Sequence, residues 1–229
     1  MRLGIINSAF EQAGMATKTG LEHISRIGFD CVDIFTEACT LKASEAKEIH
    51  KTCKALKLPI ISLPVVAVGL IDFNDPVREY HVARCKKFID LAKRWEADNI
   101  LLVLGEYIWQ REVIPPQAQW DWAIETCREL GDYADKKGVD IALELEPFRM
   151  SLLNNVKSMA KFMPSWMPSF RPAWWKKDCM RAIMVHGGGT RHPGSEGSHV
   201  CGNGVMGADI HLAMGQMRPM ALASIVISQ

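Results

Sequence analysis

Hydrophobic and acidic residues alternate along residues 139–147, which read Val-Asp-Ile-Ala-Leu-Glu-Leu-Glu-Pro. Successive side chains of a strand point to opposite faces, so this alternation predicts a buried strand. One face carries four aliphatic side chains, those of Val139, Ile141, Leu143 and Leu145. The opposite face carries Ala142, Glu144 and Glu146, which places two carboxylates at the C-terminal end of the strand.

Apolar runs of similar length recur earlier in the chain, each followed by a segment with helical periodicity. We expect strands at residues 2–7, 31–35, 58–66, 99–104 and 139–147. We expect helices at residues 19–27, 44–56, 75–95, 117–137 and 156–162. Five strand–helix units within residues 1–162 give roughly 32 residues per unit, the spacing of a (β/α)₈ barrel with short loops. The predicted fold class is an α/β TIM barrel of which five βα units are recognisable.

Polar residues and prolines mark the ends of several of these elements. Ser44 and Asp75 are predicted N-caps, because their side-chain oxygens can accept hydrogen bonds from the first turn of a helix. Asn154 or Asn155 is expected to cap the last helix for the same reason. Pro64 is expected in the loop that leaves the third strand, since proline has no N–H group to donate.

The two glutamates of the fifth strand suggest a functional site. Helices are expected to cover the outer face of a parallel sheet, so Glu144 and Glu146 would face inward. A buried carboxylate without compensation costs several kcal/mol, which implies a partner such as a metal ion, an arginine or trapped water. The alternative is that one or both glutamates lie at a solvated rim and only end the strand.

Composition and charge narrow the class of protein. The 229 residues include 27 basic and 26 acidic residues, and a net charge of +1 gives no electrostatic footprint for nucleic acid or for an anionic membrane. The apolar run from Ile60 to Ile71 is shorter than the ~20 residues that a membrane span needs. We therefore expect a cytoplasmic protein that acts on a small or neutral molecule. The seven scattered cysteines predict reduced thiols.

The last 67 residues, 163–229, differ in composition from the rest of the chain. They hold eight of the twelve methionines but only three acidic residues, and no further βα unit is recognisable. We expect two regions, a partial barrel at residues 1–162 and a poorly ordered tail rich in Met, Gly, His and Pro at residues 163–229. A shift of reading frame near Phe162 is our interpretation of this change.

Three segments resemble a known family. They are residues 101–115, which read Leu-Leu-Val-Leu-Gly-Glu-Tyr-Ile-Trp-Gln-Arg-Glu-Val-Ile-Pro, residues 141–148 and residues 152–155. Residues 1–162 resemble the xylose-isomerase-like TIM barrels, the sugar phosphate isomerases and epimerases of carbohydrate metabolism. The resemblance implies a divalent ion, Mn²⁺, Mg²⁺ or Co²⁺, held by four side chains at the mouth of the barrel. Glu144 matches the first of these ligands and the other three have no match.

The resemblance also implies an activity. Such enzymes remove a proton from carbon beside a carbonyl group of a small sugar, sugar phosphate or polyol. Glu144 would serve as metal ligand and catalytic acid/base, while Glu146, Glu106, Trp109 and Asn7 would contact substrate. Glu106 and Trp109 have an alternative interpretation as a structural clasp between loops. A glutamate that contacts substrate in related ketose epimerases is replaced here by Met150, which speaks against that specific activity.

A second hypothesis is a non-catalytic barrel remnant. Three missing metal ligands would leave the chain inactive, and the first and fifth strands would be open edges through which copies associate. A third hypothesis, an endonuclease-IV-like DNA repair enzyme, is disfavoured by the neutral charge and by the lack of a histidine-rich metal set within residues 1–162.

Overall fold

The computed structural model describes residues 2–107, 111–146, 148–166 and 225–228. The strands are β1 Arg2–Ile6, β2 Cys31–Asp33, β3 Ile60–Val66, β4 Asn99–Val103, β5 Asp140–Leu143 and β6 Ile225–Ser228. The helices are α1 Ser8–Gln12, α2 Thr17–Ile27, α3 Ala43–Ala55, α4 Asp75–Trp95, α5 Pro116–Lys137 and α6 Val156–Trp166, with a 3₁₀ turn η1 at Val68–Ile71. All five predicted strands and all five predicted helices are present.

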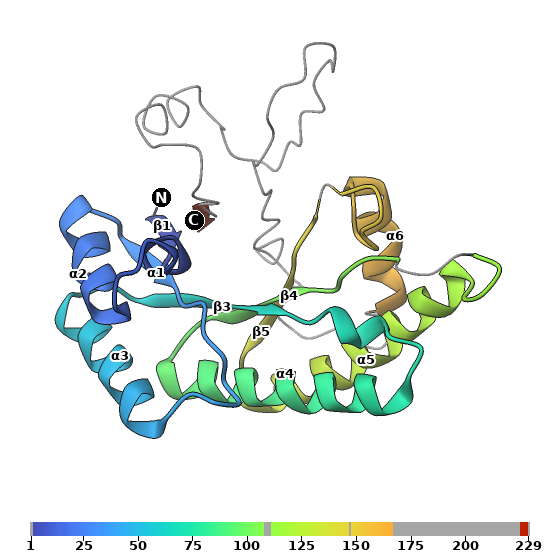
Figure 1. Ribbon diagram of the computed structural model, residues 1–229, viewed down its shortest axis with the longest axis horizontal. Coiled ribbons are helices and arrows are strands. Elements are labelled where there is room, and N and C mark those ends of the chain that lie inside the picture. The colour runs from blue at the N-terminus through green and yellow to red at the C-terminus, as the bar shows by residue number, and fades with distance from the viewer. Residues whose placement is uncertain (1, 108–110, 147, 167–224, 229) are drawn as a thin grey trace, which may run out of the picture.

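The strands form one sheet in the order β5-β4-β3-β2-β1-β6 (Figure 1). The first five pair in parallel, as predicted for consecutive βα units. β6 pairs with β1 in antiparallel register, with Arg2 opposite Ser228. The prediction that the first strand is an open edge is therefore wrong, because β6 occupies that edge. In the described part of the chain β5 pairs with β4 alone, so its other edge has no neighbouring strand.

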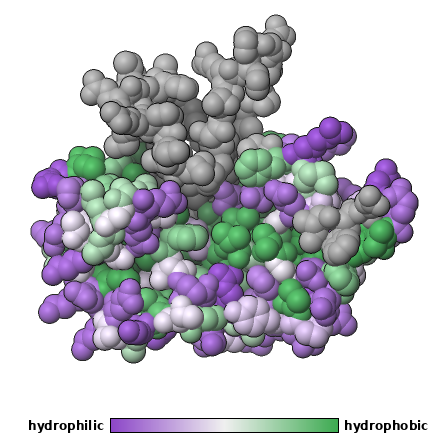
Figure 2. All heavy atoms as spheres, viewed as in Figure 1, coloured by the Kyte–Doolittle hydropathy of each residue, from purple (hydrophilic) through white to green (hydrophobic). Residues whose placement is uncertain are grey.

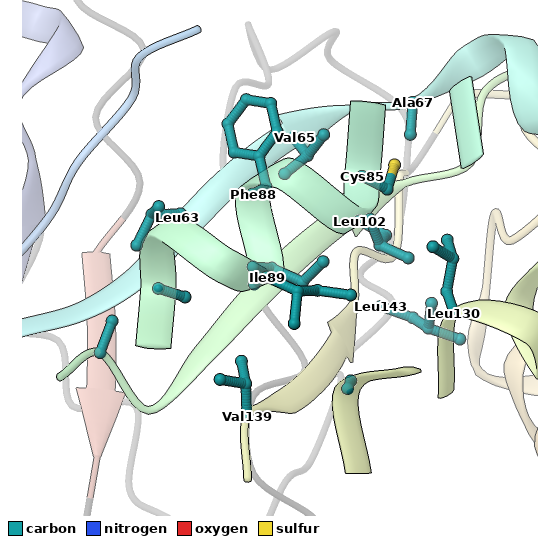
Figure 3. Packing of buried hydrophobic residues seen from close by; sticks show 14 of the residues in the cluster. Leu63, Val65, Ala67, Cys85, Phe88, Ile89, Leu102, Leu130, Val139 and Leu143 are labelled. Atoms are coloured by element: carbon teal, nitrogen blue, oxygen red, sulfur yellow. The ribbon is translucent and has the colours of Figure 1, made fainter. Parts of the chain in front are cut away.

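Helices α3, α4 and α5 lie on one face of the sheet, and the hydrophobic core lies between these helices and the sheet (Figure 1). Leu63 of β3, Leu102 of β4 and Phe88 of α4 belong to this core, and all three side chains are fully buried (Figure 3). Leu143 and Leu145 of the fifth strand belong to the same core. The predicted helix-facing side of that strand is thereby confirmed.

The ends of the helices agree with the sequence in part. Gly28 and Gly138 end α2 and α5 in the left-handed conformation, at φ +102° and +65°, which glycine adopts without strain. Asn155 caps α6, since its Oδ1 accepts a hydrogen bond from the Ser158 N–H at 2.9 Å. α6 continues to Trp166, four residues beyond the predicted end at residue 162.

Two predicted caps and one predicted loop residue are wrong. Ser44 lies inside the first turn of α3 and Asp75 is the first residue of α4, and the residues that precede these helices make no side-chain capping bond. Pro64 lies inside β3, in register with Leu101 of β4. The Ser62 carbonyl, two residues earlier, faces β2 and accepts the Ile34 N–H. The Pro64 nitrogen is thus directed past the end of β2, where no ladder bond is needed.

The tail is described only at its two ends. Residues 163–166 continue α6 and residues 225–228 form β6, so these eight residues are ordered elements, whereas residues 167–224 lie outside the described part of the chain. None of the described helices combines the length and the apolar character that a membrane span requires. The five cysteines that the structure describes are free thiols, as predicted.

Candidate functional site

The site predicted from the sequence lies on the inner face of the sheet, opposite the face covered by α3 to α5. Ala142 of β5 and Leu101 of β4 are in register there, and both are buried outside the helix-side core. Hydrophobic residues also lie on the surface near the middle of the molecule, in the region of β3 and β4 in this view (Figure 2). Apolar side chains such as Leu101 and Ala142 thus share the inner face with a few buried polar side chains.

Glu144 lies one residue past the C-terminal end of β5. Its N–H donates to the Leu102 carbonyl at 2.9 Å, so the pairing with β4 continues to this residue. Its side chain is 6% exposed and alternates with Leu143 and Leu145 of the helix-side core. A buried carboxylate therefore lies on the inner side at the end of the fifth strand, where the active sites of such barrels lie.

The loops that follow β4 and β5 are tied together by backbone hydrogen bonds. The Tyr107 N–H donates to the Met150 carbonyl at 2.7 Å, and the Leu152 N–H donates to the Gly105 carbonyl at 3.0 Å. Glu106 and Ser151 form an antiparallel bridge between the same segments. Residues 150–153, which we call the return segment, thus lie alongside the chain that leaves β4.

Glu146 is joined to the return segment from the other side. Its N–H donates to the Leu153 carbonyl at 3.0 Å, and its side chain is half-buried. Glu106 is exposed, and its backbone forms the bridge to Ser151. This bridge agrees with the alternative interpretation of Glu106 as part of a structural clasp between loops. The return segment was missed in the sequence, where Ser151 to Leu153 carried no recognisable strand signal. Trp109 lies outside the described residues.

Asn7 links the ends of β1 and β2. Its side chain is 1% exposed, its Oδ1 accepts from the Phe35 N–H at 2.6 Å, and its Nδ2 donates to Glu11 Oε1 at 2.7 Å. These bonds position the neighbouring loops and direct the Asn7 amide into the protein. Contact between Asn7 and a substrate stays a prediction.

Asp33, at the end of β2, is a buried carboxylic acid that the sequence analysis did not select. It is 1% exposed, and its Oδ2 accepts no hydrogen bond. Burial raises the pKa of Asp33 to about 7, although a hydrogen bond from the Ser62 backbone lowers it in part. The alternation of Cys31, Asp33 and Phe35 against Val32 and Ile34 was the signal that could have identified it as an inner-face residue.

An ion pair at the mouth was also missed. Arg84 of α4 donates to Glu37 Oε2 through Nε at 2.9 Å and Nη2 at 2.7 Å, and its Nη1 donates to the Val66 carbonyl at 2.9 Å. Burial alone would raise the pKa of Glu37, but the Arg84 hydrogen bonds and charge and the Cys39 N–H outweigh it, so the pKa is lowered. Arg84 thus holds the loop after β2 against the end of β3. The two residues are 47 positions apart, so no local pattern pairs them.

The described residues do not fit a complete metal site. Within residues 2–107, 111–146, 148–166 and 225–228, no three side chains of His, Cys, Asp or Glu come close enough to hold an ion together. Within the described part of the chain, Glu144 thus belongs to no group of three possible metal ligands.

Comparison with known proteins assigns the fold and the family. A family model for the xylose isomerase-like TIM barrel matches residues 21–164. A fructoselysine 3-epimerase of Shigella flexneri is 27% identical over 146 residues, 59% of this chain and 51% of the relative. A fructoselysine 3-epimerase of Escherichia coli O157:H7 is 26% identical over a stretch of the same length. The chain spans about half the length of these curated relatives.

Solved structures agree on the architecture. A D-psicose 3-epimerase of Clostridium cellulolyticum H10, solved with D-tagatose, superposes with a TM-score of 0.63 at 20% identity, covering 72% of this chain and 60% of that one. A xylose isomerase-like TIM-barrel protein of Mycobacterium smegmatis, solved with magnesium, gives 0.52 at 20% identity, covering 65% and 52%. These likenesses support the predicted α/β TIM-barrel class, here with five parallel strands. Because the family match extends over more than half of its residues, this chain belongs to the xylose isomerase-like TIM-barrel family.

Proposed function

We propose that this protein is an isomerase or epimerase of a small sugar, sugar phosphate or polyol. The observation that carries the proposal is the placement of Glu144, a buried carboxylate on the inner side at the C-terminal end of β5. Family membership and the epimerase relatives support the reaction class. The two curated relatives act on fructoselysine, and the D-psicose 3-epimerase that superposes on this chain was solved with D-tagatose, so ketoses are the substrates to test first.

The proposed reaction starts with removal of a proton from carbon beside a carbonyl group. That proton is weakly acidic, so a base must be held within hydrogen-bond reach of it. In the proposal Glu144 takes this proton and, for isomerisation, returns it to the neighbouring carbon. Epimerisation needs a second acid group that gives a proton to the opposite face of the same carbon, because return to the original face restores the starting sugar. Glu146, which is half-buried and nearer the mouth, would bind substrate hydroxyl groups, with Glu106, Trp109 and Asn7 as further contacts.

Dependence on Mn²⁺, Mg²⁺ or Co²⁺ is proposed from the family alone. Such an ion polarises the carbonyl oxygen when it is bound. Glu144 offers one oxygen ligand. Because the described residues contain no group of three possible ligands, a complete site would need ligands from outside them. The proton transfer assigned to Glu144 is argued from its position and does not depend on the ion.

Turnover and ion binding test this proposal together. The full chain is incubated with D-fructose or ε-fructosyllysine and Mn²⁺, and the products are separated by chromatography. We expect a C3 epimer from at least one ketose, at least about 100-fold less of it from Glu144→Gln, and no change in Glu125→Gln, an exposed control on α5. Calorimetry is expected to show Mn²⁺ binding that Glu144→Gln removes. Binding unchanged by Glu144→Gln contradicts its assignment as a metal ligand, and epimer formation unchanged by Glu144→Gln contradicts the proposed function.

The second candidate is a barrel remnant without catalytic activity. Two observations on the described residues favour it: no group of three possible metal ligands is present, and no strand pairs with the outer edge of β5. A remnant would show neither epimer nor Mn²⁺ binding. Size-exclusion chromatography would then show concentration-dependent association through the β5 edge, whereas a monomer that melts in one transition would count against the remnant.

A further inference from the structure

The 3₁₀ turn η1 is held between helix α4 and the loop that follows β4. It comes directly after β3, at the C-terminal end of the sheet, where the active sites of such barrels lie. Leu70 and Ile71 anchor the second half of η1 in the core, and their side chains are 0% and 2% exposed. The first half, Val68 and Gly69, makes two unusually close contacts with neighbouring elements.

The imidazole ring of His81 occupies the place of a side chain at Gly69. A Cβ atom added to Gly69 would lie 2.7 Å or less from the ring atoms Cδ2, Nε2 and Cγ, closer than the 3.0 Å below which Cβ atoms are essentially never found. The φ angle of Gly69 is not positive, so this glycine is needed for the close approach and not for its backbone conformation. We call the contact between the His81 ring and Gly69 the ring seat. It joins η1 to the second turn of α4.

Val68 makes the second close contact, with the loop after β4. A Cβ atom added to Gly105 would lie 2.9 Å from both Cβ and Cγ1 of Val68, and Gly105 has a φ of +90°. The Gly105 carbonyl accepts a hydrogen bond from the Leu152 N–H of the return segment at 3.0 Å. Two adjacent residues of η1 thus connect α4 to the loops around the candidate site.

The ring seat suits the neutral form of His81. Its Nδ1 atom is buried and has no hydrogen-bond partner among the described residues, so a protonated ring would bury an N–H group without an acceptor. Burial and the Arg84 guanidinium lower the pKa of His81 from its ordinary value of 6.5, against the opposite effects of Asp72 after η1 and Glu37 in the loop after β2. The Tyr80 ring meets His81 edge to face, with centroids 5.5 Å apart.

We propose that His81 is a pH-sensitive positioning residue, whose neutral ring holds η1 against the loop after β4 and whose protonation releases this contact. The ring is a base whose pKa is lower in the seat than outside it. The seat is therefore fully favoured above pH 6.5 and is weakened as the pH falls below 6.5. Loss of the seat lets Val68 shift relative to Gly105, so mild acid loosens the mouth of the barrel at the third strand. This switch consists of contacts within the free protein and does not rest on the proposed function.

NMR titration of the full chain, without metal or substrate, tests the proposal between about pH 8 and about pH 5. The methyl signals of Val68 are expected to move with a midpoint below 6.5, together with the Cε1–H signal of His81. His81→Phe keeps a ring but cannot be protonated, so its Val68 signals should not follow this titration. His23→Phe, the same change in a histidine of α2, is the matched control and should behave as the wild type.

Three results of this titration would overturn the proposal. The first is a wild type whose Val68 signals do not move with His81. The second is an equal movement of the Val68 signals in His81→Phe, and the third is a His81 midpoint at or above 6.5.

Gly69→Ala tests the ring seat itself, because the added methyl group and the seated ring cannot occupy the same place. The urea midpoint of unfolding at pH 8 is expected to fall by roughly 1 M in the wild type. The same change should cost less than about half of that in His81→Ala, which has no ring to displace. In Gly69→Ala the His81 midpoint should also rise toward 6.5.

Gly131→Ala on α5 is the control for this cycle, since its added Cβ would meet Trp166 Nε1 at an ordinary 3.6 Å, and it should leave both the urea midpoint and the His81 titration unchanged. An equal loss from Gly69→Ala with and without the His81 ring, or an unchanged His81 midpoint in Gly69→Ala, overturns the proposal.

Discussion

The two faces of the sheet differ in how their positions are filled. The face covered by α3 to α5 is packed with aliphatic and aromatic side chains, including Leu63, Leu102 and Phe88, which are 0% exposed (Figure 3). The inner face carries Asp33 and Glu144, both buried and acidic, among apolar neighbours. One face maximises burial of apolar surface and so stabilises the fold, whereas the other keeps costly carboxylates in place, as a functional surface does.

The largest effect is expected on the packed face. Phe88→Ala removes a fully buried ring from between α4 and the sheet, and about 3–5 kcal/mol of unfolding free energy should be lost. Urea unfolding followed by circular dichroism measures the change. Tyr80→Ala, exposed on the same helix, is the control and should cost little. A loss below about 1 kcal/mol for Phe88→Ala would show that this face is not the core.

On the inner face the expected effect depends on pH. Folding raises the pKa of Asp33 from 3.8 to about 7, so the folded state binds the proton more tightly than the unfolded state. Stability from this group is complete below pH 3.8 and is lost as pH rises toward 7, by about 4 kcal/mol in total at 1.36 kcal/mol per unit. Asp33→Asn removes this dependence.

The measurement for Asp33 compares two pH values. Urea unfolding at pH 4.5 and pH 8 should show the wild type losing stability relative to Asp33→Asn as pH rises. Glu45→Gln, an exposed carboxylate on α3, should keep the pH dependence of the wild type. Parallel pH profiles for the wild type and Asp33→Asn would show that Asp33 is not desolvated.

A smaller effect is expected at the mouth, where the two faces meet. Arg84→Gln removes the bonds to Glu37 and to the Val66 carbonyl, and unfolding free energy should fall by about 1–3 kcal/mol. Water screens part of the attraction between Arg84 and Glu37, because the Glu37 side chain is 39% exposed, and this reduces the expected loss. Arg94→Gln, exposed on the same helix, should be neutral in the same urea unfolding experiment. Equal stability of Arg84→Gln and Arg94→Gln would contradict a structural role for Arg84.

The smallest effect is expected on the outside of α5. Glu129 pairs with Lys86 at 2.6 Å, and the two side chains are 54% and 31% exposed. Glu129→Gln should cost at most about 0.5 kcal/mol, because water screens the pair. Thermal melting at low and high salt checks this, and a loss comparable to that of Arg84→Gln would contradict it.

The packed face could be predicted from the sequence because its signals are local. Alternation of period two placed Leu143 and Leu145 on the helix side and Glu144 on the other. Gly28 and Gly138 marked the helix ends, because each occupies a left-handed position that disfavours other residues. These features depend on neighbours within a few residues, which the sequence shows directly.

Much of the site could not be predicted, because it depends on contacts between distant residues. Arg84 and Glu37 meet only after α4 packs against β3, and the return segment pairs with the chain after β4, some 45 positions away. Pro64 was wrongly predicted in a loop. A proline is tolerated inside a strand where the neighbouring strand has already ended, and the position of that end depends on the fold. The position of β6 beside β1 depends on a contact across almost the whole chain.

The central claim is that Glu144 removes a proton from carbon beside a carbonyl group. Exchange of that proton in D₂O measures the step directly, because deuterium enters the ketose even when little epimer accumulates. With ε-fructosyllysine and Mn²⁺, the account predicts loss of the C3–H NMR signal in the wild type and in Glu125→Gln, and at least about 100-fold slower exchange in Glu144→Gln. Exchange at the wild-type rate in Glu144→Gln, or none above the uncatalysed rate in the wild type, would contradict it.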